Sequence, residues 1–301
     1  MTDVPHGGGK SRLLYVMVQR ISPKEKHRMK TAVFYENIRD GADALGLDLE
    51  EVTAELMDAG MEMLYLSPDS WKRDSAVLKP LLEKLSLPVE GLHVHLNFPE
   101  DPDSAEYRDA VDLAVSLKAN NLLIVPGMFR TGSTKDALES MVQGMRRAVS
   151  YGAEKGMPVV MEDFDGLLAP FNSIAGLAYF LDQVEGLGCA FDTGNFVMFH
   201  EDELAAFGLF ADRIMTVHLK DRTLVPMHPG DTPIRSADGR ECFTCAVGYG
   251  NIRIARILAD LEERGYAGNV IAELYGVDPC HILEEIRRSL SWIRSALSGR
   301  S

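Results

Sequence analysis

The sequence predicts an α/β protein that folds as a single (β/α)8 TIM barrel, and three observations support this prediction. Eight short apolar runs alternate with stretches of helical periodicity. The runs have few polar breaks, as expected of parallel strands that are covered on both faces. No Gly/Ser-rich linker divides the 301 residues, and barrels of ~250 residues fold as one unit. An open doubly wound sheet is the alternative, but no G-x-G-x-x-G motif opens a helix after an early strand.

The predicted strands are short and rich in Val, Ile, Leu and Met. The first is the least certain, because the apolar run over residues 13–18 competes with the run over 31–35. The remaining seven strands are predicted over residues 63–66, 92–95, 122–125, 159–161, 189–191, 214–217 and 270–272.

The predicted helices have acidic residues near their starts and a glycine just after their ends, which are the usual boundary signals. They are predicted over residues 47–59, 104–119, 135–155 and 252–264, while the helix after the second strand is poorly marked. Residues 222–251 form one long connection that is rich in Pro, Gly and Asp. We expect this connection to be an elaborated loop over the site.

Composition and charge exclude several classes of protein. With 46% hydrophobic and 25% charged residues, the chain is neither disordered nor fibrous. The net charge is -14, from 31 basic and 45 acidic residues, and such a surface repels phosphate backbones, so no nucleic-acid partner is expected. Basic residues nevertheless dominate the start of the chain. We therefore expect residues 1–29 to be a basic N-terminal extension and residues 30–301 to form the barrel domain.

Membrane and disulfide signals are weak. No segment approaches the ~20 apolar residues that span a bilayer, and residues 13–18 are too short a run for a secretory signal. Four cysteines do not suggest a disulfide framework, and the Cys242-x-x-Cys245 pair lacks the second pair that a structural zinc site needs. We therefore expect a cytoplasmic protein with reduced thiols and no membrane partner. Nothing in the sequence fixes the number of subunits, and a homo-oligomer is left open.

Polar residues end four consecutive predicted strands, the fifth to the eighth. They are Glu162, Asp192, His218 and Glu273. In a barrel of this kind the carboxyl ends of the strands meet at one mouth, where the chemistry takes place. Three carboxylates and one imidazole suit one divalent metal ion: Mn²⁺ first, with Mg²⁺, Co²⁺ or Zn²⁺ as alternatives. The sequence therefore predicts that these four residues bind a metal.

The segments around these residues give a family resemblance. V-M-E-D-F-D at 160–165, F-D-T-G-N-F at 191–196, V-H-L-K-D at 217–221 and I-A-E-L at 271–274 resemble the sugar phosphate isomerase/epimerase family of xylose isomerase-like barrels. That family includes ketose 3-epimerases, hydroxypyruvate isomerases and inosose dehydratases. The resemblance implies a single divalent metal held by the four residues. Family epimerases often have a substrate-contacting His three residues after the metal-binding Asp. Here that position is Asn195, which we expect to bind substrate. The identity of the substrate is left open, because an amide can hydrogen-bond a hydroxyl group but cannot act as an acid at pH 7.

Other polar residues near the predicted strand ends are candidates for substrate contact. His93 and His95 are two apart on a strand and face the same side. The H-x-H pair also occurs in amidohydrolase barrels, but there it ends the first strand, not the third. We expect His95 to contact substrate and His93 to fill the layer beneath it, with a purely structural pair as the alternative. Lys220 and Arg222 are predicted to bind substrate, with a solvated rim as the alternative.

Three further features are weaker. Gly248-Tyr249-Gly250 could let backbone N–H groups approach an anion. His200 and His228 are expected to be solvated loop residues.

The predicted chemistry is proton transfer next to a carbonyl. A bound metal acidifies the C–H bond of a keto-sugar or similar polyol ketone and stabilises the resulting enediolate. Glu162 and Glu273 are the predicted catalytic bases. Two bases on opposite faces give epimerisation, one shuttling base gives isomerisation, and loss of a β-hydroxyl gives dehydration of an inosose or oxidised sugar. An endonuclease IV-like DNA repair enzyme and a non-catalytic sugar-binding barrel are remote alternatives.

Overall fold

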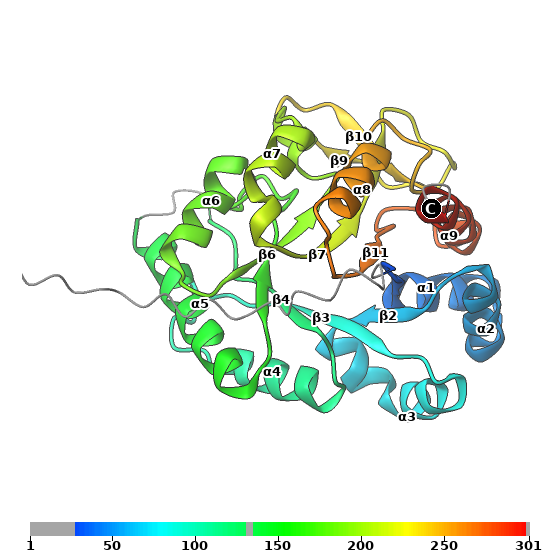
Figure 1. Ribbon diagram of the computed structural model, residues 1–301, viewed down its shortest axis with the longest axis horizontal. Helices are drawn as coiled ribbons and strands as arrows, with labels where there is room; N and C mark the ends of the chain where they lie inside the picture. The colour runs from blue at the N-terminus through cyan, green and yellow to red at the C-terminus, as the bar shows by residue number, and fades with distance from the viewer. Residues whose placement is uncertain (1–27, 131–134, 299–301) are drawn as a thin grey trace, which may run out of the picture.

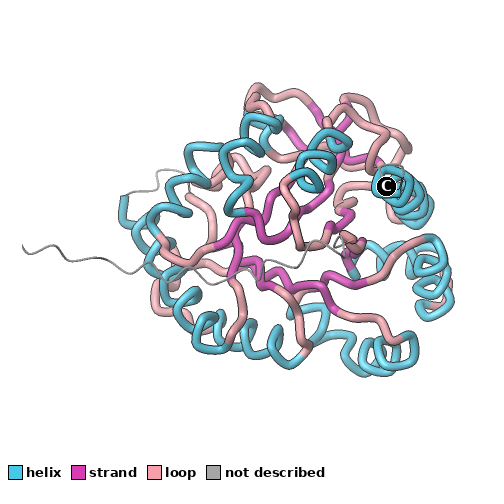
Figure 2. The backbone as a smooth tube through the Cα atoms, in the orientation of Figure 1, coloured by secondary structure: helices cyan, strands magenta, loops and turns pink. Residues whose placement is uncertain are grey.

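The computed structural model describes residues 28–130 and 135–298. Eight strands form a closed barrel in the order β1-β11-β7-β6-β5-β4-β3-β2, and every neighbouring pair is parallel. Figure 1 and Figure 2 show the strands on the inside and the helices around them. The predicted TIM barrel is confirmed, and the open-sheet alternative is wrong because β1 pairs with β11 and closes the sheet.

The barrel strands match the eight predicted runs closely. They are β1 Thr31–Phe34, β2 Met63–Leu66, β3 Val89–His95, β4 Asn121–Val125, β5 Val159–Met161, β6 Gly188–Asp192, β7 Ile214–Leu219 and β11 Val270–Ala272. The competing run over 13–18 lies outside the described residues, as does most of the predicted extension. The proposed boundary at residue 29 therefore stays a prediction.

The helices surround the barrel. They are α1 Tyr35–Leu45, α2 Leu49–Ala59, α3 Pro68–Leu85, α4 Glu106–Ser116, α5 Lys135–Lys155, α6 Ile174–Gln183, α7 Glu203–Phe210, α8 Ile254–Glu263 and α9 Ile282–Ser298, with short 3-10 turns η1 Phe196–Phe199 and η2 Ala211–Arg213. The poorly marked helix after the second strand is α3. Its start is fixed by Ser67, whose side chain accepts a hydrogen bond from the Ser70 N–H, and by Pro68 at the first turn.

The apolar core has two parts because strand side chains alternate between the inside and the outside of the barrel. A small cluster fills the interior, and a larger one joins the outer face of the strands to the helices. The interior cluster contains Ala32, Phe34, Met63, Tyr65, Leu123, Val160, Ala190 and Ile271.

The long connection after β7 is more ordered than a loop. It contains a three-stranded antiparallel sheet of β8 Asp221–Thr223, β10 Glu241–Cys245 and β9 Ile234–Arg235. This small sheet brings Ile234 to the wall of the pocket at the barrel mouth. The connection is thus elaborated and reaches the site, as the sequence predicted.

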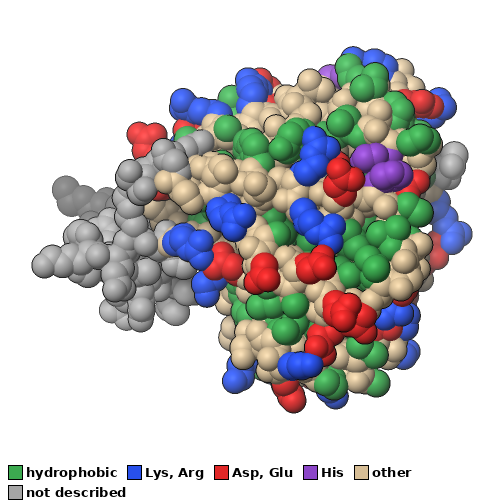
Figure 3. All heavy atoms as spheres, turned by 90° about the vertical axis from the view of Figure 1, so that its right-hand side faces the viewer, with side chains coloured by type: hydrophobic (Ala, Val, Ile, Leu, Met, Phe, Trp, Pro, Cys, Tyr) green, Lys and Arg blue, Asp and Glu red, His purple; other side chains and the backbone are tan. Residues whose placement is uncertain are grey.

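The outer surface of the barrel mixes charge and apolar groups. On the face drawn in Figure 3, acidic and basic side chains are interspersed with hydrophobic ones. Within the described part of the chain, no helix combines the length and the hydrophobicity needed to cross a membrane.

Candidate active site

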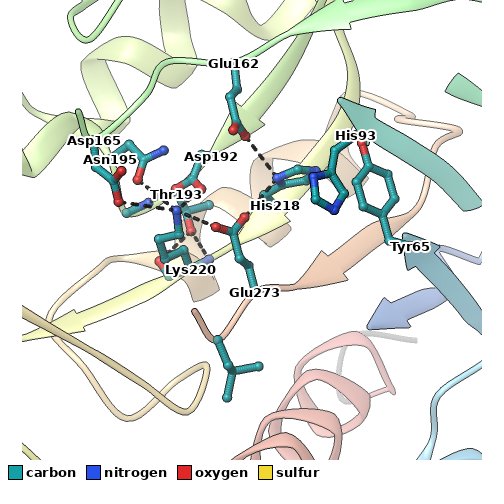
Figure 4. Close-up of polar contacts among 12 residues, drawn as sticks. Tyr65, His93, Glu162, Asp165, Asp192, Thr193, Asn195, His218, Lys220 and Glu273 are labelled. Atoms are coloured by element: carbon teal, nitrogen blue, oxygen red, sulfur yellow. Dashed lines mark hydrogen bonds and ion pairs between the residues drawn. The ribbon is translucent and has the colours of Figure 1, made fainter. Parts of the chain in front are cut away.

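The four residues at consecutive strand ends come together at the barrel mouth. Glu162 directly follows β5, Asp192 ends β6, and Glu273 directly follows β11. These strands and β7, which carries His218, are neighbours in the barrel, and Asp192 pairs with His218 across β6 and β7. All four side chains are buried, and one ligand atom from each lies within 4.8 Å of the others. The parallel register therefore brings the predicted set together (Figure 4).

His218 lies between the two glutamates. Its Nδ1 atom is 3.0 Å from Oε2 of Glu162 and 3.0 Å from Oε2 of Glu273. Burial lowers the pKa of His218, but close contact with the two negatively charged glutamates outweighs it and raises that pKa to about 10. For the Asp192 carboxyl, burial acts in the other direction: it raises the pKa to about 7, although the positive charge of Lys220 opposes this shift. The site concentrates negative charge in a place without solvent, which favours a bound cation.

The donor atoms of this cluster fit a divalent metal. Oε2 of Glu162, Oδ2 of Asp192 and Nδ1 of His218 are buried and make only ion-pair contacts, while Nε2 of His218 has no partner. Buried polar atoms normally form hydrogen bonds, so this cluster has unused capacity to bind a ligand. Three carboxylates and one imidazole could hold a divalent ion. Among residues 28–130 and 135–298, this is the one group of three or more such side chains close enough to hold an ion.

Lys220 lies inside the cluster rather than on a solvated rim. Its Nζ atom is 2.5 Å from Oε1 of Glu273, 3.0 Å from Oδ2 of Asp192 and 3.0 Å from Oδ1 of Asn195. Burial lowers the pKa of Lys220, but the surrounding carboxylates outweigh it and raise the pKa above its ordinary value. The ammonium group is therefore charged and lines the pocket.

Asn195 and Arg222 lie behind this layer. The Asn195 amide donates to the backbone carbonyl of Asp163, and its Oδ1 accepts from Lys220 and Arg222. Arg222 also donates to Asp165, to Thr244 and to the backbone carbonyl of Gly194. Neither residue lines the pocket. The structure places both where they position Lys220 and Asp165, and their predicted contact with substrate stays a prediction.

The D-T-G and H-L-K-D segments have a shared structural reason. The Thr193 hydroxyl donates to the backbone carbonyl of Lys220 and accepts from the Lys220 N–H. A Cβ atom on Gly194 would lie 2.6 Å from that same carbonyl oxygen, so only glycine allows this approach. The two segments thus lock the ends of β6 and β7 together. Asp192 and His218 are held at the required spacing as a result.

Asp221 explains the glycines of the 248–250 turn. Its two carboxylate oxygens accept four backbone N–H groups, from Arg222, Gly248, Gly250 and Ile252. A Cβ atom on Gly250 would lie 2.2 Å from Oδ1 of Asp221. The turn does bring its N–H groups to an anion, as its glycines suggested, but that anion is a carboxylate of the chain itself.

A cavity of about 380 Å³ opens over the cluster. His95 lines it, as does His93, which lies in the layer below. Its apolar and aromatic lining comes from several strands. The lining residues are Phe34, His93, His95, Leu123, Glu162, Phe164, Asp165, His218, Lys220, Ile234, Glu273 and Tyr275.

Glu36 is a polar residue that the sequence did not single out. Its Oε1 accepts hydrogen bonds from the Ser67 N–H and from the hydroxyls of Ser67 and Ser70. Its Oε2 is 3.6 Å from Nε2 of His93. Glu36 looks like an ordinary acidic residue in the first turn of α1. Its position one residue after Tyr35, where β1 has just ended, is the signal that could have identified it.

Two other histidine predictions have different outcomes. The His200 side chain is 44% exposed, as expected of a loop residue. The expectation for His228 is wrong, because its ring stacks on His281 at 4.1 Å and its Nε2 lies 3.4 Å from Glu285.

Sequence comparison places the chain among known proteins. The xylose isomerase-like TIM barrel family matches residues 41–296. An inosose dehydratase from Lacticaseibacillus casei is 27% identical over 143 residues, which cover 46% of this chain and 48% of that protein. The chain thus matches about half the length of this curated relative.

Several solved structures share the fold. The probable 3-DHS dehydratase AsbF from Bacillus anthracis superposes with a TM-score of 0.67 and 13% identity, covering 88% of this chain and 99% of that one. D-allulose 3-epimerase from Methylomonas sp. superposes with a TM-score of 0.66 and 18% identity, covering 90% of this chain and 98% of that one. A sugar phosphate isomerase/epimerase from Parabacteroides distasonis superposes with a TM-score of 0.65 and 15% identity, covering 91% of this chain and 96% of that one. At these identities the likeness shows the architecture alone.

Proposed function

The chain belongs to the xylose isomerase-like TIM barrel family, and we propose that it is a divalent-metal-dependent sugar isomerase or epimerase. Its substrate would be a keto-sugar or a similar polyol ketone, and its reaction a proton transfer next to the carbonyl. The observation that carries this proposal is the position of Glu162 and Glu273. Both line the same cavity, and both approach the same nitrogen of His218.

The metal would be held by Glu162, Asp192, His218 and Glu273, and we propose Mn²⁺ for this oxygen-rich set. A bound divalent ion supplies Lewis-acid polarisation of substrate oxygens, which makes the neighbouring C–H bond more acidic.

The glutamates would move the proton. Removal by one glutamate and return by the other, from the opposite face, gives an epimer. Removal and return to the neighbouring carbon by one glutamate gives an isomer. Lys220 and His95 also line the cavity and would bind substrate hydroxyl groups. Phe34 and Tyr275 supply aromatic surface that excludes water from the reacting carbon.

Dehydration is a second candidate reaction, and the match to inosose dehydratase favours it. The same proton removal, followed by departure of the hydroxyl of the next carbon as water with the proton that the glutamate took up, would give an unsaturated ketone. The residues required are the same, so the product distinguishes the two candidates.

The test is incorporation of solvent deuterium into D-fructose, D-allulose and scyllo-inosose, followed by mass spectrometry. We expect exchange that is lost after chelation and restored by Mn²⁺. Glu162→Gln and Glu273→Gln are each expected to lower the exchange rate by at least about 100-fold, because a general base contributes this much or more. Analysis of the recovered compound separates an epimer, an isomer and a dehydrated product.

Glu241→Gln is the matched control, because Glu241 is exposed on β10, pairs with Arg235 and does not line the cavity. It should exchange at the wild-type rate. Near wild-type exchange in both Glu162→Gln and Glu273→Gln would contradict the assignment of the bases. Binding of a ketose without exchange in the wild type would make the chain a sugar-binding protein instead.

A further inference from the structure

The cations at the barrel mouth already have carboxylate partners. Lys220 is the one Lys or Arg side chain that lines the cavity among the described residues. Its Nζ atom contacts Glu273 and Asp192 directly, and Asp165 lies 3.8 Å away. A positive charge that is shared among three carboxylates has little attraction left for an anionic ligand.

Arg222 is the next cation, and Asp165 separates it from the cavity. Its Nη2 atom donates to Oδ2 of Asp165 at 2.6 Å, while its other donors bond Gly194, Thr244 and Asn195. The side chain is 3% exposed. Arg222 is thus a buried guanidinium whose only carboxylate partner, within the described structure, is Asp165.

Asp165 itself faces the cavity. It lines the wall, its side chain is 16% exposed, and its Oδ2 atom serves both Arg222 and Lys220. A substrate phosphate or carboxylate that approached these cations would meet the Asp165 carboxylate first. Asp165 thus occupies Arg222 and stands between that guanidinium and an approaching anion.

We propose that Asp165 makes this cavity selective for uncharged polyol ketones over phosphorylated or carboxylated ones. This inference rests on the proposed function, because it names the substrate class of the same site. Asp165, Asp192 and Glu273 surround Lys220, and Asp165 also contacts Arg222, so carboxylates of the chain already neutralise both cations. An anionic group on the substrate would have to compete with these carboxylates. Ketoses and inososes fit, while hydroxypyruvate and sugar phosphates are disfavoured.

The test is direct binding to the full-length, Mn²⁺-loaded protein, measured by titration calorimetry. The uncharged probes are D-fructose, D-allulose and scyllo-inosose, and the anionic probes are D-fructose 6-phosphate and hydroxypyruvate. We expect at least one uncharged probe to bind at least about tenfold more tightly than either anionic probe. In Asp165→Asn we expect the affinity ratio of D-fructose 6-phosphate to D-fructose to rise by about tenfold, because the freed cations can bind the phosphate.

Asp212→Asn is the matched control. It removes the same charge, but its side chain is 98% exposed and it precedes β7 at the opposite end of the barrel. This variant should keep the wild-type ratio. The proposal is overturned if an anionic probe binds the wild type as tightly as the uncharged ones, if Asp165→Asn leaves the ratio unchanged, or if no uncharged probe binds.

Salt dependence gives a second measurement that needs no variant. If Asp165 repels anions, the affinity of the wild type for D-fructose 6-phosphate should rise or stay flat as NaCl increases, since salt screens repulsion. A steep fall would show an available cation and would overturn the proposal. Binding is measured apart from exchange, so a protein that selects uncharged probes without exchanging deuterium would contradict only the proposed function.

Discussion

The two halves of the barrel mouth are built from different chemistry. Where β5, β6, β7 and β11 end, charged side chains are almost completely buried, and His218 is only 1% exposed. Where β1, β2 and β3 end, the surface is aromatic and more open, with His93 12% and Glu36 16% exposed. Figure 4 shows Tyr65 and His93 to one side of the charged cluster.

Under the proposed function, this difference suits the two halves to different tasks. Buried carboxylates that face one another are stable only with cations between them, so the first half is suited to holding a metal and moving protons. In the second half, the Phe34 ring makes edge-type contacts with Tyr65 and His93, and across the boundary with Tyr275, which follows β11. This aromatic surface is suited to holding the substrate skeleton. Phe34 also contacts His218 and so joins the two halves.

Metal affinity is the sharpest way to test this division. Asp192→Asn should weaken Mn²⁺ binding by at least about 100-fold, because even residues that only support a metal ligand contribute 10–100-fold. His95→Gln, in the second half, should change the Mn²⁺ affinity by less than about threefold. Isothermal titration of chelator-treated protein measures both. Equal losses in the two variants would show that the halves are not separate.

Stability gives the next largest contrast. Asp221→Asn should lower the free energy of unfolding by about 2 kcal/mol or more, because an amide nitrogen cannot accept the N–H groups that a carboxylate oxygen accepts. Asp48→Asn should be nearly neutral, because at the start of α2 one oxygen accepts both N–H groups and Asn caps helices equally well. Urea unfolding of both variants measures the difference. A similar change in both would argue against the four-bond role of Asp221.

The smallest expected effect is the change in stability with pH that Glu36, in the second half, produces. Burial raises the pKa of Glu36, but His93 and the hydroxyls of Ser67 and Ser70 outweigh it and lower that pKa from 4.5 to about 2. The folded state therefore favours the charged form, and the stabilisation is complete above about pH 4.5 and is lost as the pH falls towards 2.

Glu36→Gln should accordingly reduce stability by about 1–2 kcal/mol at pH 7. The gap between variant and wild type should close as the pH falls from 4.5 to 2. Urea unfolding across this range measures it, and a gap that is independent of pH would refute the charged interaction.

Much of the site could be predicted because strand order alone places it. A polar residue at the end of an apolar run can be recognised in the sequence alone, and parallel strands bring such ends together. Glu36 also follows an apolar run, but its contact with His93 could not be predicted, because the two meet only through the pairing of three strands. Asp165 and Arg222 are 57 residues apart, and no local pattern indicates that the loop after β5 folds onto the residues that follow β7. His228 looked like a solvated loop residue because its partners, His281 and Glu285, come from the end of the chain.

The sequence by itself determined the barrel and the four strand-end side chains of its acidic half. These follow from local periodicity, and local periodicity depends only on neighbouring residues. Only the tertiary structure decided which charges neutralise one another. It placed Lys220 within its carboxylates, Arg222 behind Asp165 and Asp221 under the 248–250 turn. The physical reason is that the energy of a charge depends on its burial and on what lies within a few ångströms, and both are set by contacts between segments far apart in the chain.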